Sequence, residues 1–199
     1  MLEQKRKDFK GMEVKIGALF SKFGLSANQY TAISLFFVAF SFYFLTKTRM
    51  ILALVFFLFA GFLDLVDGAV ARITGKATKN GAYLDTICDR YVEGIVLLGF
   101  LFLPLPQIIL EPYVWIFIAF LGSLMTTYSK AAAKEKELVS SELKKGLVGR
   151  GERIILIALA IILGSFNLSW TLYPIIVLAI FSNLTALQRI FLALNPSNN

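Results

Sequence analysis

Residues 64–89 have the sequence DLVDGAVARITGKATKNGAYLDTICD, and this stretch decides how the rest of the chain is organised. It contains four aspartates in or beside segments that otherwise have the composition of membrane helices: Asp64, Asp67, Asp85 and Asp89. A carboxylate in hydrocarbon is costly, so acids inside a membrane segment are kept where they bind something. A divalent cation is the natural ligand for such a group.

The spacing of the acids predicts that they face one another. A helix over Met50–Arg72 puts the first two aspartates at i, i+3, and a helix over Ala82–Leu103 puts the last two at i, i+4. Both spacings place side chains on one helix face. The link over residues 73–81 contains Lys76, Lys79 and two glycines, which favours a position in water. The acids at the end of one helix should therefore lie opposite the acids at the start of the next.

The composition of this cluster favours a hard cation. Carboxylate and water oxygens suit Mg²⁺ or Mn²⁺. The chain has no histidine and a single cysteine, Cys88, which argues against a Cys/His zinc site. Mg²⁺ held by carboxylates commonly shares its ligands with substrate phosphates. Together with the positive charge of Arg72, the cluster predicts a phosphorylated substrate at a membrane surface.

The overall composition is that of a polytopic membrane protein with one domain, residues 1–199. The chain has 199 residues, 57% of them hydrophobic, and a mean hydropathy of +0.72. Its net charge is +7. The basic residues cluster in short loops between apolar segments, which indicates membrane topology and anionic lipid rather than nucleic acid.

The apolar segments predict an all-α integral membrane fold. We expect a basic, amphipathic helix at 4–23 that lies at the membrane interface, because apolar and basic residues alternate there at helical spacing. The chain start lacks the pattern of a cleavable signal peptide. Six transmembrane helices are expected, each near the ~20 residues that cross the hydrocarbon, at about 28–46, 50–72, 82–104, 112–134, 151–166 and 170–194.

The loop charges predict the orientation in the cell membrane. Seventeen lysines and arginines lie on the side of the termini and the aspartates, and the opposite loops contain only Lys47 and Arg49. Basic loops stay in the cytoplasm. Both termini and the acidic cluster are therefore expected at the cytoplasmic face.

The acidic stretch resembles the signature of the CDP-alcohol phosphotransferase family. The pattern Asp64-x2-Asp67-Gly68-x2-Ala71-Arg72-x8-Gly81-x3-Asp85-x3-Asp89 matches it at all eight positions and every spacing. The resemblance implies a homodimeric enzyme that transfers a phosphatidyl-type group from a CDP-linked lipid alcohol to a hydroxyl acceptor, with release of CMP. It also implies one or two Mg²⁺ or Mn²⁺ on the four aspartates, with Asp89 as candidate general base.

The resemblance also implies the donor-binding residues. The family commonly has Pro-Asn-x-x-Thr at the start of its first span, with Asn and Thr near the diphosphate, and this chain has Ala27 in place of the proline. The implied donor contacts are Asn28, Thr31, Asp67, Gly68, Ala71, Arg72 and Gly81. Gly68 and Ala71 would leave space for cytidine, and Arg72 would neutralise the diphosphate.

Three cations near the last spans resemble the branch of the family that makes phosphatidylinositol phosphate or archaetidylinositol phosphate. Lys130, Arg153 and Arg189 match its acceptor-phosphate residues, whereas Ala132 replaces a usual arginine and the segment VGRGER departs from the pattern. Cations bind phosphate by charge-assisted hydrogen bonds. Inositol phosphate is thus the expected acceptor, with glycerol phosphate, serine or inositol as alternatives.

Two other classes of function remain open from the residues alone. A transporter can also keep intramembrane carboxylates for a carried cation. Against it, the acids lie near one membrane face, and paired helices interrupted by Gly or Pro are not evident. A structural membrane scaffold would leave the acids unexplained. The sequence does not distinguish a diacyl donor from an archaeal ether lipid.

Overall fold

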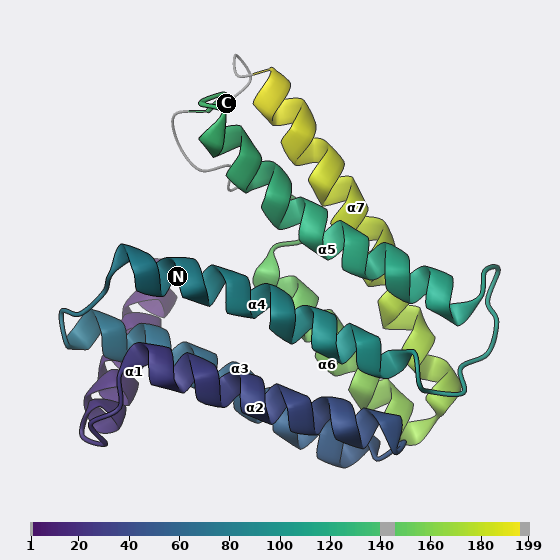
Figure 1. The fold of residues 1–199 in the computed structure, drawn as a ribbon, viewed down its shortest axis with the longest axis horizontal. Coiled ribbons are helices and arrows are strands. Elements are labelled where there is room, and N and C mark those ends of the chain that lie inside the picture. Colours follow the sequence, from purple (N-terminus) through teal and green to yellow (C-terminus); the bar gives the residue numbers. More distant parts are fainter. Residues whose placement is uncertain (1, 140–145, 196–199) are drawn as a thin grey trace.

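The computed structural model describes residues 2–139 and 146–195, and within them regular secondary structure is helical apart from an isolated bridge between Ile108 and Leu110 (Figure 1). The helices are α1 (Leu2–Ser21), α2 (Ala27–Thr46), α3 (Met50–Ile73), α4 (Lys79–Phe100), α5 (Pro112–Glu135), α6 (Arg150–Phe166), the 3-10 helix η1 (Leu168–Thr171) and α7 (Leu172–Leu194).

Each helix begins and ends within four residues of its predicted bounds, and α4 differs most. It begins at Lys79, before the predicted residue 82, because the Thr78 hydroxyl accepts a 3.0 Å hydrogen bond from the backbone N–H of Gly81. It ends at Phe100 instead of residue 104. Pro104 disfavours helix in the residue before it, and the chain turns before that point.

Within residues 2–139 and 146–195, four helical segments are long and apolar enough to cross a membrane, namely Ala27–Thr46, Met50–Ile73, Pro112–Glu135 and Leu168–Leu194. The chain is therefore a multi-pass membrane protein. Two predicted spans fall outside this group for physical reasons. Helix α4 contains several charged residues, and α6 has 17 residues, about 25 Å of helix against about 30 Å of hydrocarbon. Six spans thus remain a prediction.

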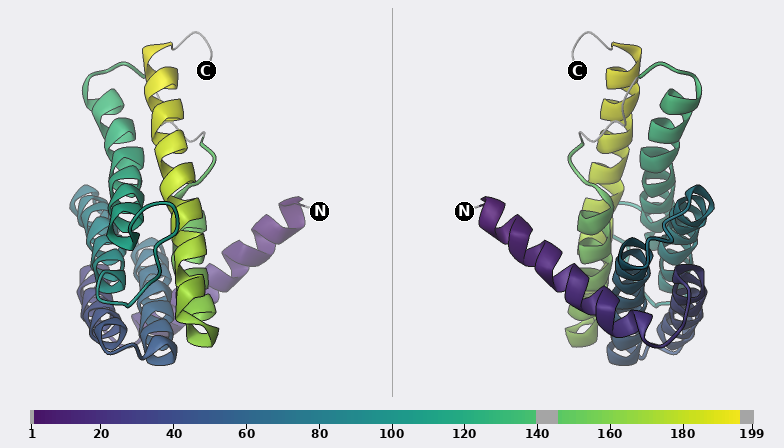
Figure 2. Two further views of the ribbon diagram at one scale, coloured as in Figure 1. Left: turned by 90° about the vertical axis from the view of Figure 1, so that its right-hand side faces the viewer. Right: turned by 90° about the vertical axis from the view of Figure 1, so that its left-hand side faces the viewer.

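The first helix forms as expected, and it packs on the bundle. Gly17 lies so close to α3 that a Cβ there would meet the Ala69 carbonyl oxygen at 2.6 Å. Tyr30 at the start of α2 donates a 2.9 Å hydrogen bond to the Phe20 carbonyl, which ties α2 to the end of α1. Figure 2 shows α1 leaving the bundle at a steep angle to the other helices. Its location at a membrane interface remains a prediction.

The other helices form two groups with α6 between them (Figures 1 and 2). Helix α2 packs along α3 and α4, and α5 packs along α7. Helix α6 contacts α3 on one side and α7 on the other. A common apolar core runs through both groups and includes Val38, Phe57, Phe100 and Ile157.

Polar contacts hold α5 against α7. The Asn183 side chain donates hydrogen bonds to the carbonyls of Ile118 (2.9 Å) and Ala179 (2.8 Å). The Thr126 hydroxyl lies 3.0 Å from the Ser182 carbonyl as a second link. Gly122 allows this approach, because a Cβ there would collide with Asn183. Small residues and buried hydrogen bonds are the usual means of packing helices in a membrane, where apolar surface alone does not drive association.

Candidate active site

Three of the four predicted aspartates lie together where α3 ends and α4 begins. Asp64 and Asp67 come from α3 and Asp85 from α4, and one carboxylate oxygen of each lies within 4.8 Å of the others. Both α3 and α4 pack along α2, so the end of α3 and the start of α4 lie near each other beside the same helix. Asp67 is buried, and the other two are half-buried.

These three carboxylates fit a divalent metal. Oxygen ligands on opposite sides of a Ca²⁺, Mg²⁺ or Mn²⁺ ion, each about 2.0–2.6 Å away, are about 4–5 Å apart. Oxygens within 4.8 Å of one another can therefore share one ion. Oxygen donors without histidine or cysteine favour Mg²⁺ or Mn²⁺ over zinc.

Asp89 lies one turn further along α4 and is linked to the cluster through an arginine. The Arg150 Nη2 is 2.7 Å from Asp64 Oδ1 and also forms an ion pair with Asp89 Oδ1. Arg150 is the first residue of α6, so this contact joins α3, α4 and α6. The guanidinium supplies positive charge between two carboxylates of the site. The sequence analysis did not assign Arg150 a role.

A second acid–base group lies one turn deeper between α4 and α6. Arg153 donates from Nε to Glu93 Oε2 and from Nη2 to Glu93 Oε1, both at 3.1 Å. Each of the two residues has 2% of its surface exposed. Arg90 also reaches this acid, with Nη1 3.1 Å from Glu93 Oε1. Arg153 was predicted as an acceptor residue, whereas Glu93 was not recognised.

Residues of α2 complete the donor side of the cluster. The Thr31 hydroxyl donates a 2.7 Å hydrogen bond to Asp67 Oδ2. Ser26 is the N-cap of α2, so Asn28 is not needed for capping. The Asn28 side-chain oxygen lies beside Gly81, where a Cβ would stand 3.4 Å from it and 3.2 Å from the Thr78 hydroxyl. Both predicted α2 residues thus lie near predicted residues of α3 or α4.

Arg72 lies at the exposed edge of the site. Its Nη2 is 3.4 Å from Glu13 Oε2 of α1, and the Arg72 side chain is largely solvent-exposed. Its guanidinium also lies over Gly68, because a Cβ at Gly68 would be 3.4 Å from two of its nitrogens. Ala71, half-buried, precedes it on α3. The contact with α1 connects the N-terminal helix to the predicted donor region.

The remaining predicted cations, Lys130 and Arg189, belong to α5 and α7. Arg189 is buried and donates a 2.7 Å hydrogen bond from Nη1 to the Thr126 carbonyl of α5. Lys130 is half-buried on α5. Within residues 2–139 and 146–195, Arg153 contacts the acidic row of α4 directly, through Glu93.

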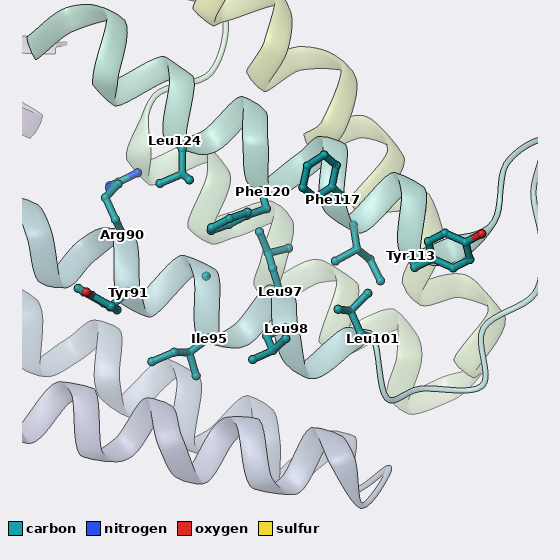
Figure 3. A pocket seen from close by; sticks show the side chains of 12 residues that line it. Arg90, Tyr91, Ile95, Leu97, Leu98, Leu101, Tyr113, Phe117, Phe120 and Leu124 are labelled. Atoms are coloured by element: carbon teal, nitrogen blue, oxygen red, sulfur yellow. The ribbon is translucent and has the colours of Figure 1, made fainter. Parts of the chain in front are cut away.

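An apolar groove of about 660 Å³ lies between α4 and α5, and Arg90, one of its lining residues, has Nη2 3.7 Å from Asp89 Oδ2. Figure 3 shows Arg90 at one end, Tyr113 at the other, and Phe117 and Phe120 along the wall. Arg90 is thus the residue that connects this groove with Glu93. The groove lining is otherwise almost entirely apolar, which suits lipid or another helix rather than a polar substrate.

A sequence signal for the missed residues exists in hindsight. Asp85, Asp89 and Glu93 follow one another at i, i+4 spacing, so the acidic face of α4 continues one turn beyond the family signature. Arg150 and Arg153 have i, i+3 spacing at the start of α6 and face that acidic row. Pairing a row of acids on one helix with a row of bases on another would have suggested both contacts.

Comparison with known proteins agrees with this geometry. Residues 25–191 match the family model described as CDP-alcohol phosphatidyltransferase. The chain belongs to the CDP-alcohol phosphatidyltransferase family. It is therefore an enzyme of the phosphotransferase class, as the acidic signature indicates.

Similar members of this family have defined names and structures. The chain is 32% identical over 194 residues to the archaetidylinositol phosphate synthase of Pyrococcus horikoshii, covering 96% of this chain and 95% of that protein. The fold is similar to phosphatidylinositol phosphate synthase of Mycobacterium tuberculosis. Its structure with CDP-DAG bound has a TM-score of 0.77, 24% identity and coverage of 91% and 92% of the two chains. Its complex with manganese and citrate has a TM-score of 0.79, 23% identity and coverage of 92% and 88%.

Proposed function

We propose that this enzyme transfers a phosphatidyl-type group from a CDP-linked lipid alcohol to inositol phosphate and releases CMP, a step of phospholipid biosynthesis. The observation that carries the proposal is that a cluster of carboxylates lies beside a pair of arginines. The carboxylates of Asp64, Asp67 and Asp85 form one cluster, and Arg150 and Arg153 of α6 face the acidic row of α4 beside it. Membership of the family and the name of the Pyrococcus relative support the donor and the acceptor.

The donor would bind on the acidic side. Asp64, Asp67 and Asp85, together with Asp89, would hold one or two Mg²⁺ or Mn²⁺, and manganese in the related M. tuberculosis structure supports this choice. When bound, the metal neutralises the diphosphate and polarises its phosphoryl oxygens. The proposed donor contacts are Asp67 of the acidic cluster and six further residues, namely Asn28, Thr31, Gly68, Ala71, Arg72 and Gly81.

The acceptor would bind on the basic side. Lys130, Arg153 and Arg189 are the proposed ligands of its phosphate, since guanidinium and ammonium groups bind phosphate by charge-assisted hydrogen bonds. Asp89 would accept the proton of the attacking hydroxyl. The new P–O bond forms to the acceptor oxygen while the bond between that phosphorus and the oxygen of CMP breaks. The residues mainly position the reactants and stabilise charge.

We further propose that the whole chain acts as one membrane domain in the cell membrane. Six spans, an interfacial α1 and a cytoplasmic active site would follow from the distribution of basic residues, and a homodimer from family resemblance. Modification of cysteines introduced singly at Lys47 and Lys76, in a Cys88→Ser background, tests the orientation. If the cysteine at position 76 reacts with a reagent that stays outside the cell, the proposed orientation is reversed. Light scattering of the purified enzyme in detergent, with the detergent mass subtracted, tests the dimer.

The experiment that tests the reaction is a panel of acceptors with one CDP-linked lipid donor and purified enzyme. Inositol phosphate, glycerol phosphate, serine and free inositol are supplied separately, with Mg²⁺, with Mn²⁺ and with a chelator. We expect CMP release that needs both metal and inositol phosphate. Equal use of another acceptor would reassign the substrate. Absence of CMP release with every acceptor would overturn the proposed reaction.

A further inference from the structure

Glu93, which was not among the site residues predicted from the sequence, has a buried and fully paired carboxylate. It contacts Arg153 at two points, Nε to Oε2 and Nη2 to Oε1, and Arg90 Nη1 at 3.1 Å. Glu93 has 2% of its surface exposed. A buried carboxylate is costly unless it is paired and hydrogen-bonded. Glu93 meets that condition through two arginines from two different helices.

The charges around Glu93 are shared between three helices. The carboxylates of Asp64, Asp89 and Glu93 contact three guanidiniums, those of Arg90, Arg150 and Arg153. Three negative charges therefore match three positive charges, and Glu93 contacts two of the guanidiniums. A phosphate on the substrate would bind these arginines by charge-assisted hydrogen bonds, through N–H groups other than those that contact the carboxylates.

The geometry of the pair also restricts Arg153. A guanidinium is planar and presents its donors in a rigid fork. The Glu93 pair uses Nε and Nη2, so the remaining edge at Nη1 has a fixed direction relative to α4. Without Glu93 a buried arginine would have a different rotamer or would recruit another partner.

We propose that Glu93 is a positioning residue that orients Arg153 for the phosphate of the acceptor and thereby sets which hydroxyl reaches Asp89. The proposal rests on the proposed function. Asp89 and Glu93 are four residues apart on α4, a rise of about 6 Å along the helix. The proposed base and the group that anchors the phosphate-binding arginine therefore belong to one rigid element. The spacing selects acceptors in which the hydroxyl and the phosphate are separated by a comparable distance.

The alternative is that Glu93 and Arg153 only join α4 to α6. Helix α4 packs much less closely on α6 than on α2, so a structural link there would matter. The two roles differ in what they predict for kinetics. A structural link affects stability and both substrates together, whereas a positioning residue affects the acceptor alone.

The test uses steady-state kinetics with each substrate varied in turn, on the full-length enzyme in lipid nanodiscs. Glu93→Gln keeps the size and removes the charge. We expect it to raise the acceptor KM about tenfold or more, as for loss of a hydrogen bond to a charged group, with the donor KM changed less than about twofold. Glu93→Asp retains the charge and should restore part of the acceptor affinity. Val96→Ala, a fully buried apolar change on the same helix, is the structural control and should lower thermal stability without an acceptor-specific effect.

A double variant makes the test independent of folding losses. If Glu93 acts through Arg153, Glu93→Gln should add little to the acceptor KM of Arg153→Ala, so the two effects should not multiply. Multiplying effects, or a Glu93→Gln enzyme with unchanged acceptor KM while Arg153→Ala raises it, would overturn the proposal. If Glu93→Gln does not fold, the same acceptor-only effect is required of Glu93→Asp. A wild-type enzyme that does not use inositol phosphate would instead overturn the proposed function, and this is seen before a variant is made.

Discussion

The Thr31 hydroxyl of α2 donates a 2.7 Å hydrogen bond to the buried carboxylate of Asp67 on α3. The same hydroxyl lies 3.1 Å from the Ala27 carbonyl one turn earlier in α2. One side chain therefore connects the start of the first long apolar helix to the acidic cluster. It holds one Asp67 oxygen in place and leaves the other oxygen available for a metal.

Removal of this hydrogen bond should weaken binding on the donor side. Thr31→Val keeps the shape and should raise the donor KM and the Mn²⁺ concentration for half-maximal activity about ten- to hundredfold, because hydrogen bonds to charged groups are worth about 1.5–3 kcal/mol. Ser34→Ala is the matched control, since the Ser34 hydroxyl donates to the Thr31 carbonyl within α2. Equal effects of the two changes would contradict a role for Thr31 at the site.

Loss of an acidic ligand should abolish metal binding. We expect Asp64→Asn or Asp85→Asn to lose nearly all turnover while the protein stays folded. Mn²⁺ binding, measured by electron paramagnetic resonance on the purified enzyme, should fall in parallel. Glu111→Gln, a change of an exposed acid in the loop before α5, serves as control. Activity within a few-fold of wild type in both aspartate variants would refute the metal assignment.

Asp89 should act on the rate more than on binding. General-base assistance stabilises the transition state, so Asp89→Asn should lower kcat more strongly than it raises the donor KM. Initial rates over a range of donor concentrations at saturating acceptor separate the two. A change in donor KM or in Mn²⁺ affinity alone would make Asp89 a ligand and not the base.

Changes at Arg153 and Arg189 should weaken binding of the acceptor. Arg153→Ala and Arg189→Ala should each raise the acceptor KM about ten- to hundredfold, the cost of a lost charge-assisted hydrogen bond. The donor KM should be nearly unchanged. Arg49→Ala, an exposed arginine at the start of α3, provides a control at the predicted opposite face. An acceptor KM unchanged in both site variants would defeat the assignment of a phosphate site.

The α5–α7 contact should depend on Gly122. A Cβ at this position collides with Asn183, whereas a Cβ at Gly61 meets nothing within 4 Å. Overpacking costs about 1–3 kcal/mol, so Gly122→Ala should lower the midpoint of thermal unfolding in detergent. Gly61→Ala should leave it unchanged or raise it, since alanine is the better helix former. A lower midpoint for Gly61→Ala than for Gly122→Ala would contradict the packing described.

Much of the fold follows from the sequence because the membrane restricts the choice of structure. A long apolar segment has to be helical in lipid, and caps and prolines then mark its ends. The spacing of Asp64, Asp67 and Asp85 predicted that they meet, since helical periodicity places the acids of each helix on one face, and a short link joins the two helices. Helix ends and residue spacing depend on neighbouring residues in the sequence, so they can be predicted from one sequence.

The contacts between distant helices were not predictable in the same way. Arg150 of α6 pairs with Asp89 of α4, and Glu93 of α4 pairs with Arg153 of α6. Both contacts require α6 to lie against α4, which depends on packing of the whole bundle. Arg72 was expected near the diphosphate, yet its partner Glu13 comes from α1, whose angle to the bundle has no sequence signal. Side-chain partners across a bundle depend on helix orientation, which periodicity alone leaves open.

The division of the bundle into two helix groups with α6 between them has a kinetic consequence. The proposed donor residues belong to α2, α3 and α4, while two of the three proposed acceptor cations belong to α5 and α7. In the proposed reaction the two substrates would therefore be held mainly by different helix groups, and α6, which contacts both groups, would help to set the distance between them. Lipid thickness or pressure, which tilts helices, would then change the turnover number while both substrates still bind as before.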